Sequence, residues 1–307
     1  VYGRAVRVAE GTRPGPRPQS SPTRSVSLRG VTLDPFESPL EPFESPKELI
    51  NGVKERIAEL KSICDSVRET RDYEVITDND PKTRDKIVKL RLKQRFPTKI
   101  RRLTSSVLKE LKTALDQAFS ESALMLGRKH ARGIYFPFGK DVEDLERSVK
   151  RNCEGVDVGL IEFCLLFKPY HGIDGNKVLW SMSKMAGTTH ETIVGVGFED
   201  TTSFVEAITL ATGGMKLIIN KWNELHNEIE VARVPPGGEL HVKNDFTLRF
   251  EIVFSKRAHA LRFCPLIPSL YDLSGIVEVI VAGIEAQTAR ILRERSCKDS
   301  REEGQSA

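Results

Sequence analysis

The stretch that decides the fold runs from Phe96 to Gly127 and reads FPTKIRRLTSSVLKELKTALDQAFSESALMLG. Its apolar residues recur at three- and four-residue spacing, which predicts one long helix that buries a single stripe. We expect Thr98 to cap the start of this helix, directly after Pro97, and Gly127 to end it. The helix therefore needs a partner layer, which the rest of the chain has to supply.

One acid, Asp116, lies within the apolar run of that helix. A carboxylate in such a place is costly unless it is paired or hydrogen-bonded. We therefore expect a structural partner for it, either Lys112 one turn earlier or a backbone N–H from a loop. The alternative is that Asp116 is a weak catalytic candidate, a buried general base with a raised pKa.

Upstream of the long helix, the sequence predicts a first helix and a β-hairpin. Ser45-Pro46-Lys47-Glu48 has the pattern of a capping box and opens a helix that extends to Glu69. Residues 73–76 and 87–93 alternate apolar and polar side chains on either side of a turn-rich segment, as the two strands of a hairpin do.

Downstream of the long helix, a loop and three shorter helices come before a change of period. Residues 133–139, GIYFPFG, carry four apolar or aromatic side chains, so we expect this loop to plug the end of a core. Shorter helices are predicted at 141–150, 156–167 and 177–185.

From about residue 192 the pattern alternates with a period of two. Five or six strands are predicted with no helices between them, which favours an antiparallel sheet. They span residues 193–198, 204–210, 215–222, 228–234, 239–242 and 246–254. A last helix is predicted over 269–295, packing back on the first. The fold class is therefore α+β: a helical layer with a small β-hairpin, an antiparallel sheet and a C-terminal helix packing back.

We expect four regions along the chain: a disordered Arg/Pro/Ser-rich tail at 1–44, a mainly helical region with the hairpin at 45–190, the sheet and last helix at 191–295, and a disordered polar tail at 296–307. The two middle regions are expected to form one composite domain. Residues 1–46 hold eight of the sixteen prolines and show no apolar periodicity, so this segment cannot bury enough surface to offset its chain entropy.

The N-terminal segment contains no continuous apolar stretch, which argues against a secretory signal. It begins with Val1, and we expect a misplaced or non-standard start, with a processed end as the alternative. Residues 34–39, DPFESP, are nearly repeated at 41–46, EPFESP. We interpret the repeat as a small tandem duplication in a linker, and a short linear motif for a partner groove is the alternative.

The net charge of +4 is misleading, because residues 1–33 carry six arginines and one acid and the remainder is close to neutral. The five cysteines are dispersed without a CxxC pair, which argues against a disulfide framework or a zinc site and fits a reducing cytoplasm. No apolar run approaches the about 20 residues needed to span a bilayer. We therefore expect a cytoplasmic protein with no membrane partner and no cofactor.

The best candidates for a hydrolytic or metal site are His171, Asp174 and His190. A His/Asp/His set can hold a divalent cation or act as acid and base. Against this hypothesis, nineteen residues separate the histidines, no HExxH motif is present, and Gly172 and Gly175 indicate an ordinary turn. The three residues are therefore weak catalytic candidates, and we predict no metal ligand.

A second candidate is electrostatic. Residues 82–102 contain ten basic residues and one acid. If the strand and helix residues of this segment converge, they can neutralise several phosphates of a nucleic acid. The residues proposed for this role are Lys89, Arg91, Lys93, Lys99, Arg101 and Arg102. The alternative is a solvated face with acids of the first helix nearby.

Four short motifs occur in a fixed order: LKTALD at 111–116, FPF at 136–138, KPY at 168–170, and Leu179-Trp180 before His190. In this order they resemble a recurring group of uncharacterised bacterial proteins. There, an LRxALD-like helix precedes an FPF-type loop, a PY motif and a Lys-His-Arg triplet. The resemblance spans roughly residues 47–293. This chain departs from it at Lys112, which replaces the arginine, and at His190, which lacks basic neighbours. The resemblance implies a fold and a bacterial source, and no activity.

Three functional hypotheses remain. The main expectation is a non-catalytic cytoplasmic protein that works by binding an unknown protein partner. The alternatives are a nucleic-acid-binding protein that acts through residues 82–102 and a hydrolase that uses His171, Asp174 and His190.

Overall fold

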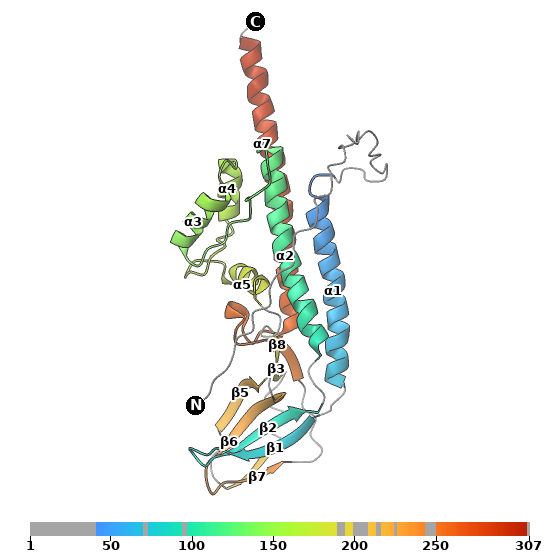
Figure 1. The fold of residues 1–307 in the computed structure, drawn as a ribbon, viewed down its shortest axis with the longest axis vertical. Coiled ribbons are helices and arrows are strands. Elements are labelled where there is room, and N and C mark those ends of the chain that lie inside the picture. Colours follow the sequence, from blue (N-terminus) through green and yellow to red (C-terminus); the bar gives the residue numbers. More distant parts are fainter. Residues whose placement is uncertain are drawn as a thin grey trace, which may run out of the picture. The chain divides into compact units, whose positions relative to one another are not determined.

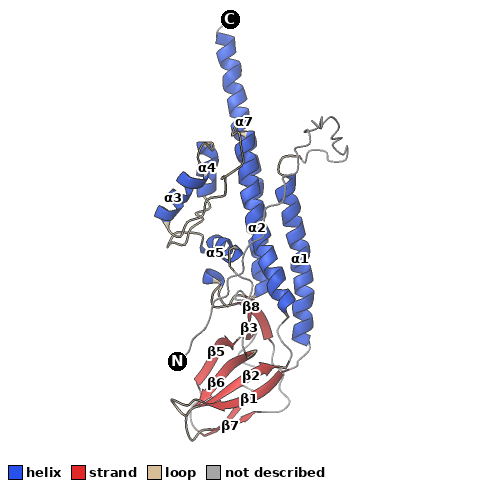
Figure 2. Cartoon of the chain, viewed as in Figure 1, coloured by secondary structure: helices blue, strands red, loops and turns tan. Residues whose placement is uncertain are grey.

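The computed structural model describes residues 41–69, 73–93, 97–188, 194–198, 208–212, 216–223, 226–242 and 250–305. All of these residues belong to one compact unit, Leu40–Ala307. This unit contains both helices and antiparallel strands (Figure 1), and the strands form sheets that lie apart from the long helices along most of their length (Figure 2). The predicted α+β fold is therefore confirmed.

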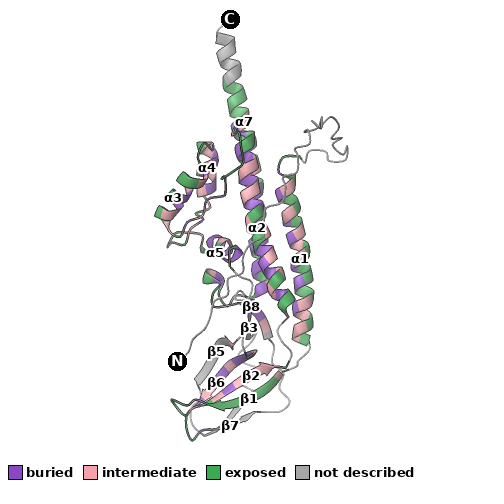
Figure 3. Cartoon of the chain, in the orientation of Figure 1, coloured by how far each residue is buried: buried purple, intermediate pink, exposed green. Residues whose placement is uncertain are grey.

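Three long helices form the helical layer. They are α1 (Glu44–Glu69), α2 (Thr98–Met125) and α7 (Leu266–Gln305), and each packs against the other two, so the C-terminal helix does return to the first. Their apolar stripes belong to one core, in which Ile57, Leu111 and Ile280 are fully buried (Figure 3). The stripe that the sequence of α2 predicts is thus covered by the first and last helices.

The main sheet has four antiparallel strands in the order β1-β2-β6-β5. They are β1 (Tyr73–Asn79), β2 (Lys86–Leu92), β5 (Lys216–Asn223) and β6 (Glu228–Val234). The predicted hairpin is not a separate element, because β2 also pairs with β6, where Lys89 lies opposite Glu230. Val88, Leu90 and Ile229 are buried, so the sheet contributes side chains to the core.

Two further strand pairs and the short helices complete the unit. β3 (Val194–Phe198) pairs with β8 (Phe250–Phe254), and β4 (Ile208–Thr212) pairs with β7 (Glu239–Val242). The short helices are α3 (Val142–Asn152), α4 (Val158–Leu165), α5 (Lys177–Ala186) and the 3-10 helix η2 (His259–Leu261). Parts of the strands predicted at 193–198, 204–210, 215–222 and 246–254 lie outside the described residues.

The two ends of α2 differ in how well the sequence predicts them. The predicted cap at Thr98 is wrong, because Thr98 is the first helical residue and Pro97 occupies the cap position without a side-chain hydrogen bond. The predicted exit is correct. Gly127 follows the helix with a φ of 102°, a conformation that favours glycine.

The start of α1 is set by a tertiary contact. Phe43 has a φ of 67°, buries its ring in the core and donates its N–H to Glu121 of α2 at 2.8 Å. The helix therefore begins at Glu44, and Ser45 lies inside it, where its hydroxyl donates to Gln117 of α2 instead of forming the predicted capping box. Because Phe43 is part of the core, the tail predicted to extend to residue 44 does not reach that far.

The last helix, α7, is longer than the sequence predicts. It extends to Gln305, so the frayed tail predicted from residue 296 is wrong over 296–305. The physical reason is that this polar segment contains no proline, and its one glycine, Gly304, comes only at the end.

By length and composition, α7 is also the one helix among the described residues that is long and apolar enough to cross a membrane, over Leu266–Lys298. This finding corrects the expectation from the sequence that no apolar run approaches the length needed to span a bilayer. Within the unit, Leu270 and Ile284 of the helix are buried in the core, and Glu278 pairs with Lys54 of α1. The core helix of a globular protein passes the same test, so the finding is weak grounds for a membrane segment.

Candidate anion-binding surface

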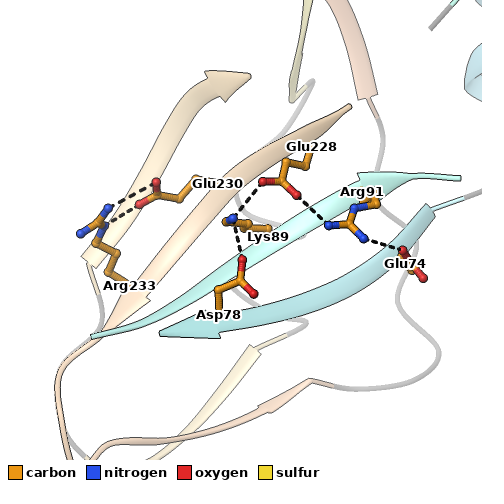
Figure 4. Close-up of polar contacts among 7 residues, drawn as sticks. All are labelled: Glu74, Asp78, Lys89, Arg91, Glu228, Glu230 and Arg233. Carbon is orange, nitrogen blue, oxygen red and sulfur yellow. Dashed lines mark hydrogen bonds and ion pairs between the residues drawn. The ribbon is translucent and has the colours of Figure 1, made fainter. Parts of the chain in front are cut away.

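The basic strand β2 lies in a network of ion pairs (Figure 4). The Nζ of Lys89 is 2.6 Å from Asp78 and 2.8 Å from Glu228. The guanidinium of Arg91 is 3.2 Å from Glu228 and 3.6 Å from Glu74. These acids come from β1 and β6, which the sheet pairing places on either side of β2. The positive charge that the sequence assigns to a nucleic-acid site is therefore compensated locally.

The same arrangement continues on β6. The guanidinium of Arg233 lies 2.6 Å from Glu230 on its own strand and 2.6 Å from Asp80 at the β1–β2 turn. Figure 4 shows the first of these pairs beside the Lys89 network. This network therefore holds three neighbouring strands together by charge as well as by backbone hydrogen bonds.

The other residues proposed for nucleic acid lie at or near the start of α2. Lys99 pairs with Glu59 of α1 at 2.7 Å. This contact fits the alternative to a nucleic-acid site, in which acids of the first helix lie near a solvated basic face. Arg101 is half-buried, and Lys93 and Arg102 are exposed. Since at least three of the six proposed residues lie in ion pairs, segment 82–102 offers less free positive charge than its sequence suggests.

Glu228 is the most deeply placed member of the network. Burial acts to raise the pKa of its carboxyl, but hydrogen bonds from Lys89 and Arg91 outweigh this effect and hold the pKa below its ordinary value. The hydrogen bonds that Lys89 donates to Asp78 and Glu228 raise the pKa of the lysine. Both shifts favour the charged forms, so the contact stays an ion pair at neutral pH.

Asp116 is engaged in structural contacts. Its Oδ2 accepts a 2.5 Å hydrogen bond from Lys112, one turn earlier, and its Oδ1 accepts the backbone N–H of Phe136 at 3.1 Å. Burial raises the pKa of this carboxyl, and the two hydrogen bonds act in the opposite direction. Both contacts expected of an anchor are present, and they attach the FPF loop to the long helix.

The FPF and KPY motifs noted in the sequence form a chain of contacts from that anchor. The FPF loop buries Phe136, as predicted for a plug. Gly139, just after it, donates its N–H to the carbonyl of Pro169 in the KPY motif at 3.1 Å. The turn that follows needs glycine at 175, because a Cβ there would lie 2.1 Å from the carbonyl oxygen of Tyr170. This tight turn presents His171 to α5.

Trp180 of α5 is the centre of an aromatic and cationic cluster. The indole centroid is 4.6 Å from the imidazole of His171 and 4.9 Å from that of His259. The Nζ of Lys184 is 5.7 Å from the indole centroid, within the range of a cation–π contact. The indole itself is only 6% exposed, whereas the two histidines and the lysine are exposed.

Two basic segments, 168–184 and 255–262, meet at this cluster. They are also joined by the N–H of Ala260, which donates to Oγ of Ser181 at 3.1 Å. Together they contain one acid, Asp174, and six basic residues, all exposed and none in an ion pair within the described part of the chain. These are Lys168, Lys177, Lys184, Lys256, Arg257 and Arg262. We call the six, together with His171, Trp180 and His259, the Trp180 surface.

One acid on the neighbouring helix α3, Asp144, interacts electrostatically with Lys184 of this surface. The pKa of Asp144 in α3 is lowered chiefly by the backbone N–H of Lys140 and by Arg147, and Lys184 makes a smaller contribution. Asp144 already accepts hydrogen bonds from Lys140 and Arg147, so its negative charge is shared with these two donors. The ammonium group of Lys184 therefore remains available to a ligand.

Both basic segments have strained backbone conformations. Lys168, His259 and Phe263 have φ values of 48°, 53° and 63°, which bulky non-glycine residues rarely adopt. The carbonyl of Lys168 accepts two backbone N–H groups, and the N–H of Phe263 donates to the carbonyl of Phe254 at 2.8 Å. Such strain persists where surrounding contacts impose it, and it is concentrated at functional sites.

The hydrolase hypothesis finds little support in the described residues. His171 packs on Trp180, and Asp174 is exposed in the turn. His190 lies outside the described residues. Within the part of the chain that the structure describes, no group of three His, Cys, Asp or Glu side chains is placed to hold a metal ion.

The Trp180 surface is not predicted from the sequence. His171 and Trp180 are noted there for other reasons, and the basic residues of both segments are missed. Two features of the sequence could have indicated the surface, the adjacent Lys256-Arg257 and the presence of only one acid in 168–184. Both are weak indications, because basic residues are common on protein surfaces. Comparisons with protein-family models, with curated proteins and with solved structures each gave no match.

Proposed function

We propose that the protein is a non-catalytic binding protein whose Trp180 surface recognises an acidic segment of a protein partner. The observation that carries the proposal is the excess of positive charge in these two segments, which hold six exposed basic side chains against one acid, with none of the six in an ion pair within the described residues. Such a surface steers negatively charged partners toward it and discriminates against positively charged ones.

Exposed apolar side chains next to the cations favour a peptide over a nucleic acid. Ile173 is 96% exposed and Phe263 39% exposed, two and four residues from the histidines of the cluster. A peptide that combines acidic and apolar side chains can use both kinds of contact. A nucleic acid offers little to an aliphatic side chain, and Trp180 is too buried to stack on a base.

The contacts of the catalytic candidates also support a binding role. Asp116 uses both carboxylate oxygens to attach Lys112 and the FPF loop. His171 places its ring against an indole rather than against a carboxylate. Electrostatic recognition is therefore the chemistry that the described side chains favour.

A binding titration with a charge-reversed variant tests the proposal. The probe is a fluorescent peptide of glutamate and leucine residues, and the variant is Lys177→Glu, Lys184→Glu, Arg257→Glu in the full chain. We expect fluorescence anisotropy to show that the variant loses about tenfold or more in affinity, because each exposed charge contributes up to about 1 kcal/mol and three are reversed. Affinity of the wild type should fall as salt is added.

The matched control is Lys82→Glu, Lys109→Glu, Lys129→Glu, which changes the net charge equally at three exposed lysines outside the surface. We expect it to bind the peptide as the wild type does. Equal losses in both variants would mean that net charge alone drives binding and would overturn the proposal. Binding of a single-stranded RNA or a DNA duplex in place of the peptide would overturn it in favour of a nucleic-acid ligand.

A further inference from the structure

The indole of Trp180 has a polar group with no partner. Its Nε1 is shielded from solvent and forms no hydrogen bond to any described residue. Trp180 is also more than nine-tenths buried as a whole, with an exposure of 6%. Buried N–H groups in native proteins are nearly always paired, and an orphaned one calls for an explanation. An acceptor atom of a bound ligand is one such explanation.

The groups around the indole share one chemical character. His171, His259 and Lys184 lie 4.6, 4.9 and 5.7 Å from the indole centroid. A lysine ammonium offers only donors, and an imidazole offers one or two. Together with the indole N–H, they form a set suited to an anionic group with several acceptor oxygens.

The indole lies between the core and the surface. Trp180 belongs to α5, whose neighbouring residues Leu179 and Met182 are fully buried. The two imidazoles that pack on Trp180 are exposed. The helix that carries the indole is therefore anchored in the core, and the groups that cover the indole lie at the surface.

We propose that Trp180 is the base of an oxyanion subsite within the Trp180 surface. A carboxylate or phosphate group of the ligand takes the place of one imidazole, accepts the indole Nε1–H and lies within reach of the Lys184 ammonium. This inference rests on the proposed function, because it names the group by which the acidic partner is held. The shared chemistry is an oxyanion, and it has two sources: an acidic side chain or a phosphorylated one.

The test is nuclear magnetic resonance of the indole N–H groups in the full chain. The sequence has two tryptophans, Trp180 and Trp222, so the ¹H–¹⁵N spectrum has two indole signals, and Trp180→Phe assigns them. We expect the Trp180 signal to move downfield on titration with inorganic phosphate, with a glutamate peptide or with a phosphoserine peptide. The Trp222 signal should move less. The tightest of the three titrations identifies the source of the oxyanion.

Two variants keep the test decisive. Lys184→Gln leaves the indole intact and should weaken the phosphate titration several-fold, while Lys82→Gln, a lysine outside the surface, should not. If a glutamate or phosphoserine peptide binds without moving the Trp180 signal, the subsite is overturned and the proposed function stands. If phosphate moves the signal but neither peptide binds, the subsite stands and the proposed function fails. If no probe moves the signal, the subsite is overturned.

Discussion

Asp116 joins the long helix to the FPF loop through a single carboxylate. Burial raises the pKa of this carboxyl above its ordinary value, against the opposing hydrogen bonds from Lys112 and Phe136. A carboxyl with a raised pKa binds its proton more tightly in the folded protein than in the unfolded chain. Its contribution to stability is therefore full below the ordinary pKa of about 3.9, and it is lost as the pH rises through the folded pKa.

We expect Asp116→Asn to remove this pH dependence and to keep an acceptor for the N–H of Phe136. At pH 7 its free energy of unfolding should stay within about 1 kcal/mol of the wild type, whereas Asp116→Ala leaves a buried N–H unpaired and should lose about 1–3 kcal/mol. Urea unfolding of both variants at pH 4 and pH 7 measures the difference. Equal losses at pH 7 would contradict the role of this residue as a hydrogen-bonding anchor.

At the scale of the element, strand β2 is held in the sheet partly by charge. Glu228 of β6, whose side chain is 5% exposed, pairs with Lys89 and Arg91 of β2. Its pKa is held below the ordinary value, since the hydrogen bonds outweigh the effect of burial. The contribution to stability is therefore present above the ordinary glutamate pKa of about 4.3, and it is lost as the pH falls through the folded pKa.

Removing the shared acid should loosen the sheet. We expect Glu228→Ala to lose about 2–4 kcal/mol in the free energy of unfolding at pH 7, because it leaves two cations without their deepest partner. The control, Glu74→Ala, removes an exposed partner of Arg91 and should lose at most about 1 kcal/mol. Urea unfolding between pH 7 and pH 3 should show the loss from Glu228→Ala shrinking as the pH falls. A loss that is independent of pH would argue that packing, and not charge, is responsible.

At the scale of the whole molecule, the cysteines report on the integrity of the core. Cys64, Cys153 and Cys164 are buried on three different helices or their ends, Cys264 is half-buried and Cys297 is exposed. Burial raises the pKa of Cys64 and Cys153 to about 12 and that of Cys164 well above its ordinary value. A thiol that stays protonated and buried does not react.

A thiol reagent should therefore distinguish the folded protein from the unfolded one. We expect an aromatic disulfide reagent at pH 8 to label Cys297 rapidly, Cys264 more slowly and the other three only when the unit opens. Cys297→Ser should remove the fast phase and leave the rest, and all five thiols of the wild type should react at once in urea. Rapid labelling of Cys64 or Cys164 in the native protein would show that the helical core is not closed as described.

Much of the secondary structure is legible in the sequence because periodicity is a local property. The predicted bounds of β6 and β7 agree with Glu228–Val234 and Glu239–Val242, and α2 and α5 agree to within a few residues. The errors fall at helix starts, at the end of β1 and at the end of α7. At Phe43 a distant contact with α2, and not the local capping pattern, determines where the helix begins.

The candidate site, unlike the secondary structure, depends mainly on the tertiary structure. By itself, the sequence determined the α+β class, the buried stripe of the long helix and the anchoring of Asp116, because these follow from side-chain spacing and from the cost of burying charge. Only the tertiary structure decided which basic residues are free. Sheet pairing brings acids to Lys89 and Arg91, and the packing of η2 on α5 brings two basic segments together at Trp180. Charge compensation depends on distance in space, and spacing along the chain does not encode it.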